Sequence, residues 1–405
     1  MIGWEKARGV RPRGILYWEG NRMKKTRILS LVLAGALLTV PLAGCGGAGG
    51  SSDKIVIGGL APLSGNVSQY GNAVYHAVQM AVDDINAKGG VLGKDIEYIC
   101  YDEKGDSTEA TNAYARLVDE DKIVALIGDV TSAPCEAVAQ RAAQDNLPMI
   151  TPSGTSEVIT SYGENVFRAC FIDPYQGQLM ASYAAEKLDA KTAAILYDNG
   201  DPYSTGIADA FEEAAKGLGL TITNKESYAS KSTDFNAQLT KIKSGNPDVL
   251  LLPVYYSDVV LIAKQAKDQG LTCTLLGADG WDGVAAQLDE SSADVVAGSY
   301  FCSQYSASST DPELQDFLKR YREKYNEEPN MFAVLGYDSM QIMAAAIEAA
   351  GSTDSAAIIE ALKATNYDGL TGNTTFDDKR NPVREAIITS FDGLNYKVVE
   401  TYSIS

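Results

Sequence analysis

The chain contains a single histidine among its 405 residues, His76. One imidazole cannot supply a His-rich metal site, and it supports at most one imidazole-based catalytic dyad. The sequence also contains no Gly-x-Ser-x-Gly nucleophile elbow. His76 itself lies in an apolar pattern that is better explained by helix packing. These absences argue against an enzyme and predict neither a metal site nor a cofactor.

Acidic residues outnumber basic residues in this chain. The chain has 34 Lys and Arg against 53 Asp and Glu, a formal net charge of -19. Eight of the basic and two of the acidic residues lie within residues 1–44, so the remainder carries a net charge of -25. Nucleic acids and anionic lipid surfaces attract basic patches. The composition therefore predicts no nucleic-acid partner.

Paired cysteine motifs are also missing. Of the six cysteines, none lies in a Cys-x-x-Cys pair, which leaves a zinc or redox motif unsupported. Five follow Cys45, an odd number, so at least one thiol remains unpaired. We expect most of these five to be small buried hydrophobic residues; they are Cys100, Cys135, Cys170, Cys273 and Cys302.

The sequence has no apolar run of the about 20 residues that a membrane-spanning helix needs. The apolar stretch 28–40 is too short, but the basic residues of 23–27 precede it and small residues follow it, which is the pattern of an export signal. Residues 1–22 carry no apolar pattern and are interpreted as an extension from a start codon assigned too early. The remaining alternative is a genuine long basic region.

The end of this stretch, Leu42-Ala43-Gly44-Cys45, resembles the processing box of bacterial lipoproteins. The resemblance implies that residues 1–44 are removed and that Cys45 is lipidated. It predicts an exported protein held at the extracytoplasmic face of the cell membrane by its lipid anchor alone. The Gly- and Ser-rich residues 45–52 are then a flexible leash.

Beyond the leash, short apolar runs alternate with helical patterns, which is typical of βαβ units and parallel sheets. The length suggests two domains. A first block predicts strands at 54–60, 96–101, 123–128 and 147–151, with helices at 72–88, 108–121 and 133–145. After a break at 161–175, a second block predicts strands at 192–197, 220–228, 248–254 and 273–278, with helices at 204–217, 234–244 and 258–269. The tail adds helices at 311–326, 332–350 and 354–364 and strands at 385–391 and 396–404.

Ligands of such sheets bind at the carboxyl ends of the strands, where helix N-termini attract anions. In the first block, residues 128–133 and 151–156 follow two strands and supply Ser and Thr hydroxyls. In the second block, Asp279 ends a strand and could hold an ammonium group. Each feature has a structural alternative, because Ser and Thr favour helix caps and Asp-Gly favours turns.

Several segments closely resemble bacterial branched-chain amino-acid-binding proteins, the receptors of ABC importers. The most specific is 68–103, which contains the helix ending Asp84-Ile85-Asn86-Ala87-Lys88-Gly89-Gly90. Further matches lie, in the expected order, at 148–156, 198–206, 263–271 and 276–281.

The resemblance implies an α/β type I periplasmic-binding-protein fold, with two Rossmann-like lobes whose central parallel sheets are joined by three crossover strands. Lobe 1 would comprise 53–173 and 303–381, and lobe 2 would comprise 174–302 and 382–405.

The resemblance also implies a binding site between the lobes. The α-carboxylate of the ligand would be held by Ser132, Ser153 and Thr155, and its ammonium group by Asp279. Tyr203 and Tyr255 would close over the ligand, and Tyr70 would line the pocket for its side chain. The roles of Trp281 and of the aromatic residues in 300–302 stay open, since each could contact the ligand or fill the interior.

The chain departs from better-known relatives at two points. They carry a glutamate where Asp279 stands, which leaves the identity of the amino acid open. A disulfide of some relatives has no counterpart, because Gly105 and Thr131 occupy its positions.

The resemblance therefore predicts a monomeric solute-binding lipoprotein that delivers an amino acid, with Leu, Ile or Val favoured, to ABC permease subunits. Two alternatives stay open: a ligand-sensing lipoprotein, and a binder of amides, urea or aromatic acids with the same fold.

Overall fold

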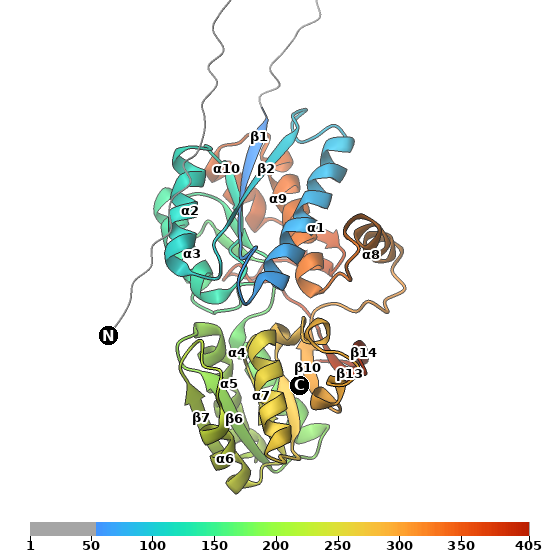
Figure 1. The fold of residues 1–405 in the computed structure, drawn as a ribbon. Helices are drawn as coiled ribbons and strands as arrows, with labels where there is room; N and C mark the ends of the chain where they lie inside the picture. The colour runs from blue at the N-terminus through green and yellow to red at the C-terminus, as the bar shows by residue number, and fades with distance from the viewer. Residues whose placement is uncertain (1–53, 405) are drawn as a thin grey trace, which may run out of the picture. The chain divides into compact units, whose positions relative to one another are not determined.

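The computed structural model describes residues 54–404, so the predicted export signal and Cys45 lie outside the described residues. The chain begins with a five-stranded parallel sheet of order β2-β1-β3-β4-β5. Helices separate the strands along the chain (Figure 1). The elements are β1 (Ile55–Ala61), α1 (Ser68–Ala87), β2 (Ile96–Asp102), α2 (Ser107–Asp119), β3 (Ala125–Ile127), α3 (Ser132–Asp145), β4 (Met149–Thr151), η1 (Ile159–Tyr162) and β5 (Val166–Arg168).

The second sheet has seven strands in the order β14-β13-β10-β9-β8-β6-β7. Strands β6 to β10 run parallel, whereas β13 pairs antiparallel with both β10 and β14. The elements are α4 (Asp173–Glu186), β6 (Thr192–Asp198), α5 (Pro202–Leu218), β7 (Thr221–Tyr228), α6 (Asn236–Gly245), β8 (Val249–Leu251), α7 (Tyr256–Asp268), β9 (Thr274–Gly277), η2 (Asp279–Trp281), η3 (Ala285–Gln287), η4 (Ala293–Val296), β10 (Tyr300–Ser303), β13 (Ala386–Asp392) and β14 (Asn395–Tyr402).

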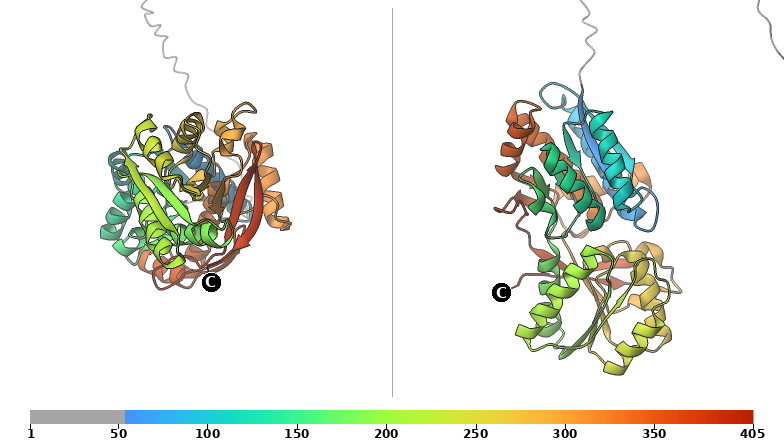
Figure 2. Two further views of the ribbon diagram at one scale, coloured as in Figure 1. Left: turned by 90° about the horizontal axis from the view of Figure 1, so that it is seen from below. Right: turned by 90° about the vertical axis from the view of Figure 1, so that its left-hand side faces the viewer.

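The chain passes between the two sheets three times: after β5, after β10 and before β13. Between the second and third passages it adds elements to the first lobe, namely α8 (Pro312–Tyr325), α9 (Met331–Ala350), α10 (Ser355–Lys363), β11 (Asn366–Gly369) and β12 (Gly372–Thr375). In Figure 2 these orange and red segments lie beside the blue and teal segments of the first lobe. The predicted α/β fold with two lobes and three crossovers is thus confirmed.

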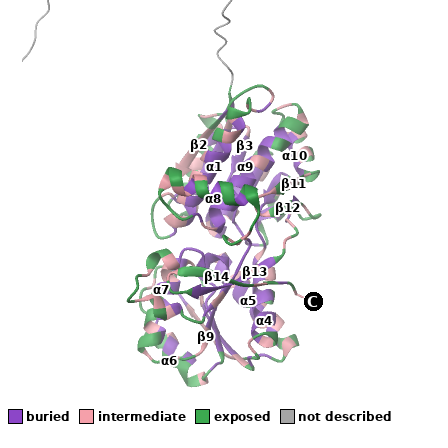
Figure 3. Ribbon diagram, turned by 90° about the vertical axis from the view of Figure 1, so that its right-hand side faces the viewer, coloured by how far each residue is buried: buried purple, intermediate pink, exposed green. Residues whose placement is uncertain are grey.

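Helix α1 shows how the sequence encodes these layers. Val74, Val78, Ala81 and Ile85 recur at intervals of three or four residues and are buried. The helix ends where Gly89 and Gly90 adopt positive φ angles of 106° and 74°, which glycine tolerates. Its apolar face packs against α9, of which 15 of 20 residues are buried (Figure 3).

The break expected at 161–175 is wrong in part, because β5 and the start of α4 lie within it. Helix α4 is buried at 9 of its 14 positions, and the buried residues include Asp173 and Gln176. It therefore lacks the single apolar stripe by which a surface helix is recognised. The hairpin of β11 and β12 was also not predicted, and its residues are mostly polar and exposed.

The five cysteines within 54–404 are all free thiols; Cys135, Cys170 and Cys302 are buried. The same residues contain no cluster of His, Cys, Asp or Glu able to hold a metal ion. In this part of the chain no single helix is long and apolar enough to cross a membrane, and α9 and α10 meet that test only as a pair bent by 114°.

Candidate ligand-binding site

A small cavity lies between the lobes and is lined from both sides. The open space between its lining residues is about 210 Å³, which includes space open to solvent. Six of the seven residues predicted for the site line it, the exception being Tyr70. The lining residues are Val130, Thr131, Ser132, Ser153, Thr155, Tyr203, Tyr255, Asp279, Gly280 and Phe332.

The first lobe contributes hydroxyl groups and a helix N-terminus. Ser132 is the first residue of α3, and its Oγ lies 3.4 Å from Oγ1 of Thr155 in the loop after β4. Thr131, the residue that precedes the helix, makes no side-chain cap hydrogen bond. The first N–H groups of α3 and its positive dipole end therefore face the cavity without a local carboxylate or hydroxyl cap, which suits an anion.

Ser153 has a different place in this wall. Its hydroxyl donates to the carbonyl oxygen of Val130 at 2.7 Å and so ties the loop after β4 to the loop after β3. Ser156 N donates to Ser132 Oγ at 3.2 Å and adds a second tie between the same loops. The proton of Ser153 is thus already engaged, whereas Ser132 and Thr155 face each other across the wall.

The buried guanidinium of Arg168 holds the loop after β4 in place. Its two Nη atoms donate to the carbonyl oxygens of Gly154 at 2.9 Å and Ser156 at 2.8 Å. Both carbonyls flank Thr155. Arg168 is fully buried, so these charge-assisted bonds lie in a low-dielectric interior where they are strong.

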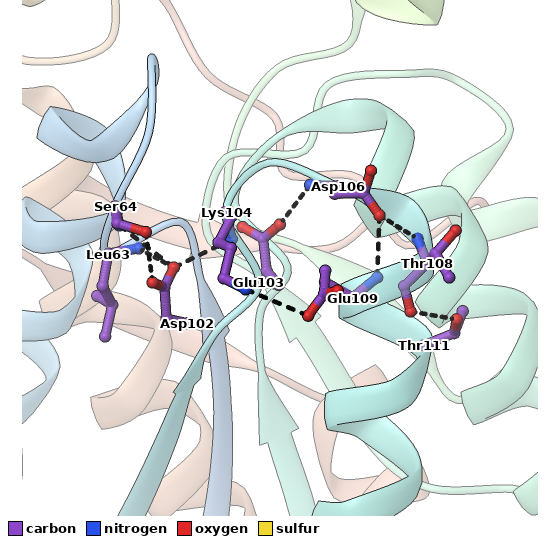
Figure 4. Close-up of polar contacts among 9 residues, drawn as sticks. All are labelled: Leu63, Ser64, Asp102, Glu103, Lys104, Asp106, Thr108, Glu109 and Thr111. Carbon is purple, nitrogen blue, oxygen red and sulfur yellow. Dashed lines mark hydrogen bonds and ion pairs between the residues drawn. The ribbon is translucent and has the colours of Figure 1, made fainter. Parts of the chain in front are cut away.

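Two acidic side chains lie beneath the same wall, where β2 and β3 end. Glu103 and Asp129 are fully buried, and one carboxyl oxygen of each, Glu103 Oε1 and Asp129 Oδ2, has no hydrogen-bond partner among the described residues. Glu103 Oε2 also accepts from Asp106 N at 3.0 Å (Figure 4), and Asp129 Oδ1 accepts from Val130 N at 2.5 Å. Burial raises the pKa of both groups, and the neighbouring Asp129 raises that of Glu103 further. Both shifts favour the protonated, neutral form of a carboxyl group in this pair.

The raised pKa of Glu103 has a consequence for stability. The pKa of such a carboxyl is higher in the folded than in the unfolded chain, where it is about 4.3 for Glu. The group does not change the free energy of unfolding below about pH 4.3, and it lowers this free energy as the pH rises above that value. Glu103→Gln mimics the protonated form and can make the same hydrogen bonds. We expect the free energy of unfolding of the variant to rise relative to that of the natural chain between pH 5 and 8, by at most about 1.4 kcal/mol per pH unit. Denaturant titrations at several pH values measure this, with Glu109→Gln, an exposed residue of α2, as control; equal pH slopes for Glu103→Gln and the natural chain would contradict it.

The second lobe contributes a carboxylate and two tyrosines. Tyr203 OH donates to Asp279 Oδ1 at 3.0 Å and accepts from Gly280 N at 2.9 Å. The ring of Tyr203 stacks on that of Tyr255, with centroids 4.8 Å apart. Asp279 is only 2% exposed. Burial raises its pKa to about 6, and the hydrogen bond from Tyr203 opposes this rise. A cation in the cavity would stabilise the ionised form of Asp279.

Tyr70 lies behind the cavity wall. Its ring stacks on Phe332 with centroids 4.1 Å apart, and its hydroxyl accepts from Tyr256 N at 3.1 Å and donates to the carbonyl oxygen of Gly280. It thus contacts two residues that line the cavity. Phe332, in the first turn of α9, was missed because no motif marks this part of the tail as a site.

Of the aromatic residues whose roles were left open, Trp281 and Phe301 lie in the interior, whereas Tyr300 is partly exposed. Trp281 is fully buried, donates from Nε1 to the carbonyl oxygen of Leu252 at 2.8 Å and packs near Phe301. Phe301 belongs to β10, the strand that leads into the second crossover. Neither residue lines the cavity, so Trp281 fills the loop rather than capping the site.

A two-lobed α/β binding protein, with a cavity between the lobes that residues of both lobes line, is the class that this fold and site define. The chain belongs to the periplasmic binding protein family, whose model matches residues 54–393.

Individual relatives agree with this assignment. A leucine-, isoleucine-, valine-, threonine- and alanine-binding protein of Pseudomonas aeruginosa is 29% identical over 359 residues, which cover 88% of this chain and 94% of the relative. The structure of LivJ of Streptococcus pneumoniae, a branched-chain amino acid transporter substrate-binding protein in complex with isoleucine, is 34% identical with a TM-score of 0.79 and 85% and 99% coverage. The leucine-binding protein LivK of Thermotoga maritima is 32% identical, also with a TM-score of 0.79 and with 86% and 98% coverage.

The homologues are solute-binding proteins, not enzymes, and the predicted resemblance is confirmed.

Proposed function

We propose that this chain is the lipid-anchored substrate-binding protein of an ABC importer and that it captures a branched-chain amino acid between its lobes. The observation that carries the proposal is the division of charge across the cavity. One wall offers hydroxyls and an uncapped helix N-terminus at Ser132, and the other offers the buried carboxylate of Asp279. An α-amino acid presents the complementary pair of charges.

Each end of the ligand is assigned to one lobe. The α-carboxylate is placed at the N-terminus of α3, where Ser132 and Thr155 donate hydrogen bonds. The ammonium group is placed against Asp279, because a buried ammonium needs a counter-charge. Phe332 lines the cavity and Tyr70 stacks behind it, which suits an apolar side chain. Relatives whose names state leucine, isoleucine or valine binding support this choice.

The division of partners between lobes also explains how binding drives closure. Three crossovers connect the lobes, and the ligand's two charges are satisfied together only when both walls meet it. The bound amino acid therefore favours the closed form by the difference in its interactions with the closed and open forms. The closed form is the one that we propose is presented to the permease.

The proposed location rests on the sequence. A lipid on Cys45 and the leash 45–52 would tether the domain to the outer face of the membrane. Such tethering keeps the binding protein close to its permease without a transmembrane helix.

The proposal is tested by calorimetric titration of the purified full chain, unfolded and refolded to remove carried-over ligand. We expect one-to-one binding of Leu, Ile or Val, and at least tenfold weaker binding of Glu or Lys, whose side-chain charge would enter an apolar pocket unpaired. The measurement includes urea, an amide and benzoate. Binding of one of these, with no response to any amino acid, would overturn the assignment of the two walls to a zwitterion.

A further inference from the structure

The segment 279–283 meets the first lobe at the cavity, at the bond from Tyr70 OH to Gly280 O and again at Asp282. Asp279 begins the short η2 helix and lines the cavity, and Asp282 follows three residues later in the same turn, with its N–H bonded to Asp279 O at 3.0 Å. Asp282 does not line the cavity, yet it is only 3% exposed. Its carboxylate points across the boundary between the lobes.

The partner of Asp282 is the N-terminus of α9. Met331 N, in the first residue of this 20-residue helix, donates to Asp282 Oδ2 at 2.6 Å. Asn330 caps the same helix locally by accepting from Ala333 N at 3.1 Å. Helix α9 therefore has two caps, of which one is supplied by the opposite lobe. A carboxylate at a helix N-terminus is a favourable, charge-assisted pairing.

The segment that carries Asp282 is held firmly on its own lobe. Trp281 anchors it through the bond to Leu252 O, and Gly283 N donates to Tyr396 OH at 2.7 Å. At Gly283 the approach to the first lobe is close, because a Cβ there would lie 2.9 Å from Gln69 Oε1 of α1. Because the segment is fixed on the second lobe, Asp282 moves with that lobe when the lobes separate.

We propose that Asp282 is a positioning residue that latches the closed form by capping α9 across the lobe boundary, and so slows ligand release without touching the ligand. This inference deepens the proposed function and rests on it. The bond between Asp282 and Met331 joins the two lobes, so it exists only while they are together. When the lobes separate, water satisfies both groups. In the closed form, removal of the carboxylate leaves the buried Met331 N–H without an acceptor, a cost that falls on that form alone.

The position of the latch links it to the site at both ends. On the second lobe it lies three residues from Asp279, and on the first lobe Met331 precedes Phe332, which lines the cavity. Displacement of either wall from the ligand would lengthen this bond. The latch thus responds to the separation of the walls that hold the ligand.

Stopped-flow measurement of ligand dissociation from the purified full chain tests the proposal, with the amino acid that binds most tightly in the titration above. We expect Asp282→Ala to raise the dissociation rate by roughly 10-fold or more, because one closed-state hydrogen bond is lost, with little change in the association rate. Asp282→Asn retains an acceptor for Met331 N and is expected to stay within about threefold of the natural chain. Asp294→Ala removes an exposed acid of the same lobe and serves as the control.

The unfolding midpoint distinguishes the loss of this bond between the lobes from damage to the fold of one lobe. The unfolding midpoint of the ligand-free Asp282→Ala variant should match that of the natural chain, because the bond joins lobes and not elements of one lobe. An unchanged dissociation rate in Asp282→Ala, or equal acceleration in the Asn and Ala variants, would overturn the latch. If the natural chain binds no amino acid, the proposed function fails instead, which the titration reports before any variant is made.

Discussion

Asp279→Ala is expected to weaken amino-acid binding by about 100- to 1,000-fold and to leave both lobes folded. The ligand's ammonium would remain buried in the closed cavity without its counter-charge, and loss of one partner of a buried ion pair costs about 3–5 kcal/mol. Tyr203 OH would lose its acceptor as well, since it donates to Asp279 Oδ1. Calorimetric titration measures the loss of affinity, and circular dichroism checks the fold.

A further variant separates charge from shape at this position, and a second, elsewhere in the chain, serves as its control. Asp279→Asn keeps the size and the acceptor oxygen but removes the charge, so we expect a loss close to that of Asp279→Ala. Glu290→Ala removes an exposed acid eleven residues farther along the chain and should bind as the natural chain does. Near-normal affinity in Asp279→Asn would show that the ammonium is held elsewhere.

Arg168→Met should lower the free energy of unfolding by roughly 3 kcal/mol or more and should also weaken binding. Three hydrogen bonds would be lost, a long one to Glu157 O at 3.3 Å and two shorter, charge-assisted ones of about 1.5–3 kcal/mol each. The carbonyls of Gly154 and Ser156 would stay buried without these donors. The methionine retains much of the apolar stem, so the change isolates the guanidinium. Binding suffers because Thr155 lies between the two released carbonyls.

Denaturant unfolding and titration of the same sample measure both effects. Arg116→Met, on the exposed side of α2, removes the same group from the surface and is expected to change stability by no more than about 0.5 kcal/mol. Full stability of Arg168→Met would show that the loop after β4 is fixed by its other contacts, such as the bond from Ser153 to Val130 O.

Much of the fold could be predicted because the repeating strands and helices appear in the sequence as alternating periods. Helix α1 carries its apolar stripe in Val74, Val78 and Ile85, and the resemblance supplied the order of the lobes. By contrast, β5 has three residues and α4 is buried on most sides. Neither offers a period that distinguishes an inner from an outer face.

The site was predictable where it is built from loops that follow strands, as at Ser132, Thr155 and Asp279. Phe332 was not, because it enters the cavity from a helix of the distant tail and only the packing of α9 on α1 brings it there. Glu103 and Asp282 were not predicted from the sequence, for another reason. Their surroundings consist of backbone groups and residues remote in sequence, so nothing local distinguishes them from exposed acids.

The threefold passage of the chain between its lobes sets the order in which a newly made molecule can fold. A chain that emerges N-terminus first exposes β1 to β5 long before α9, the helix that buries α1, has appeared. The second sheet likewise remains incomplete until β13 and β14 are synthesised, and these strands lie within the final 20 residues. Neither half can reach its finished core until nearly the whole polypeptide is available. Until then the polypeptide lacks a complete core, so it can still pass through a narrow channel as an extended chain. It becomes rigid only when its last strands are available.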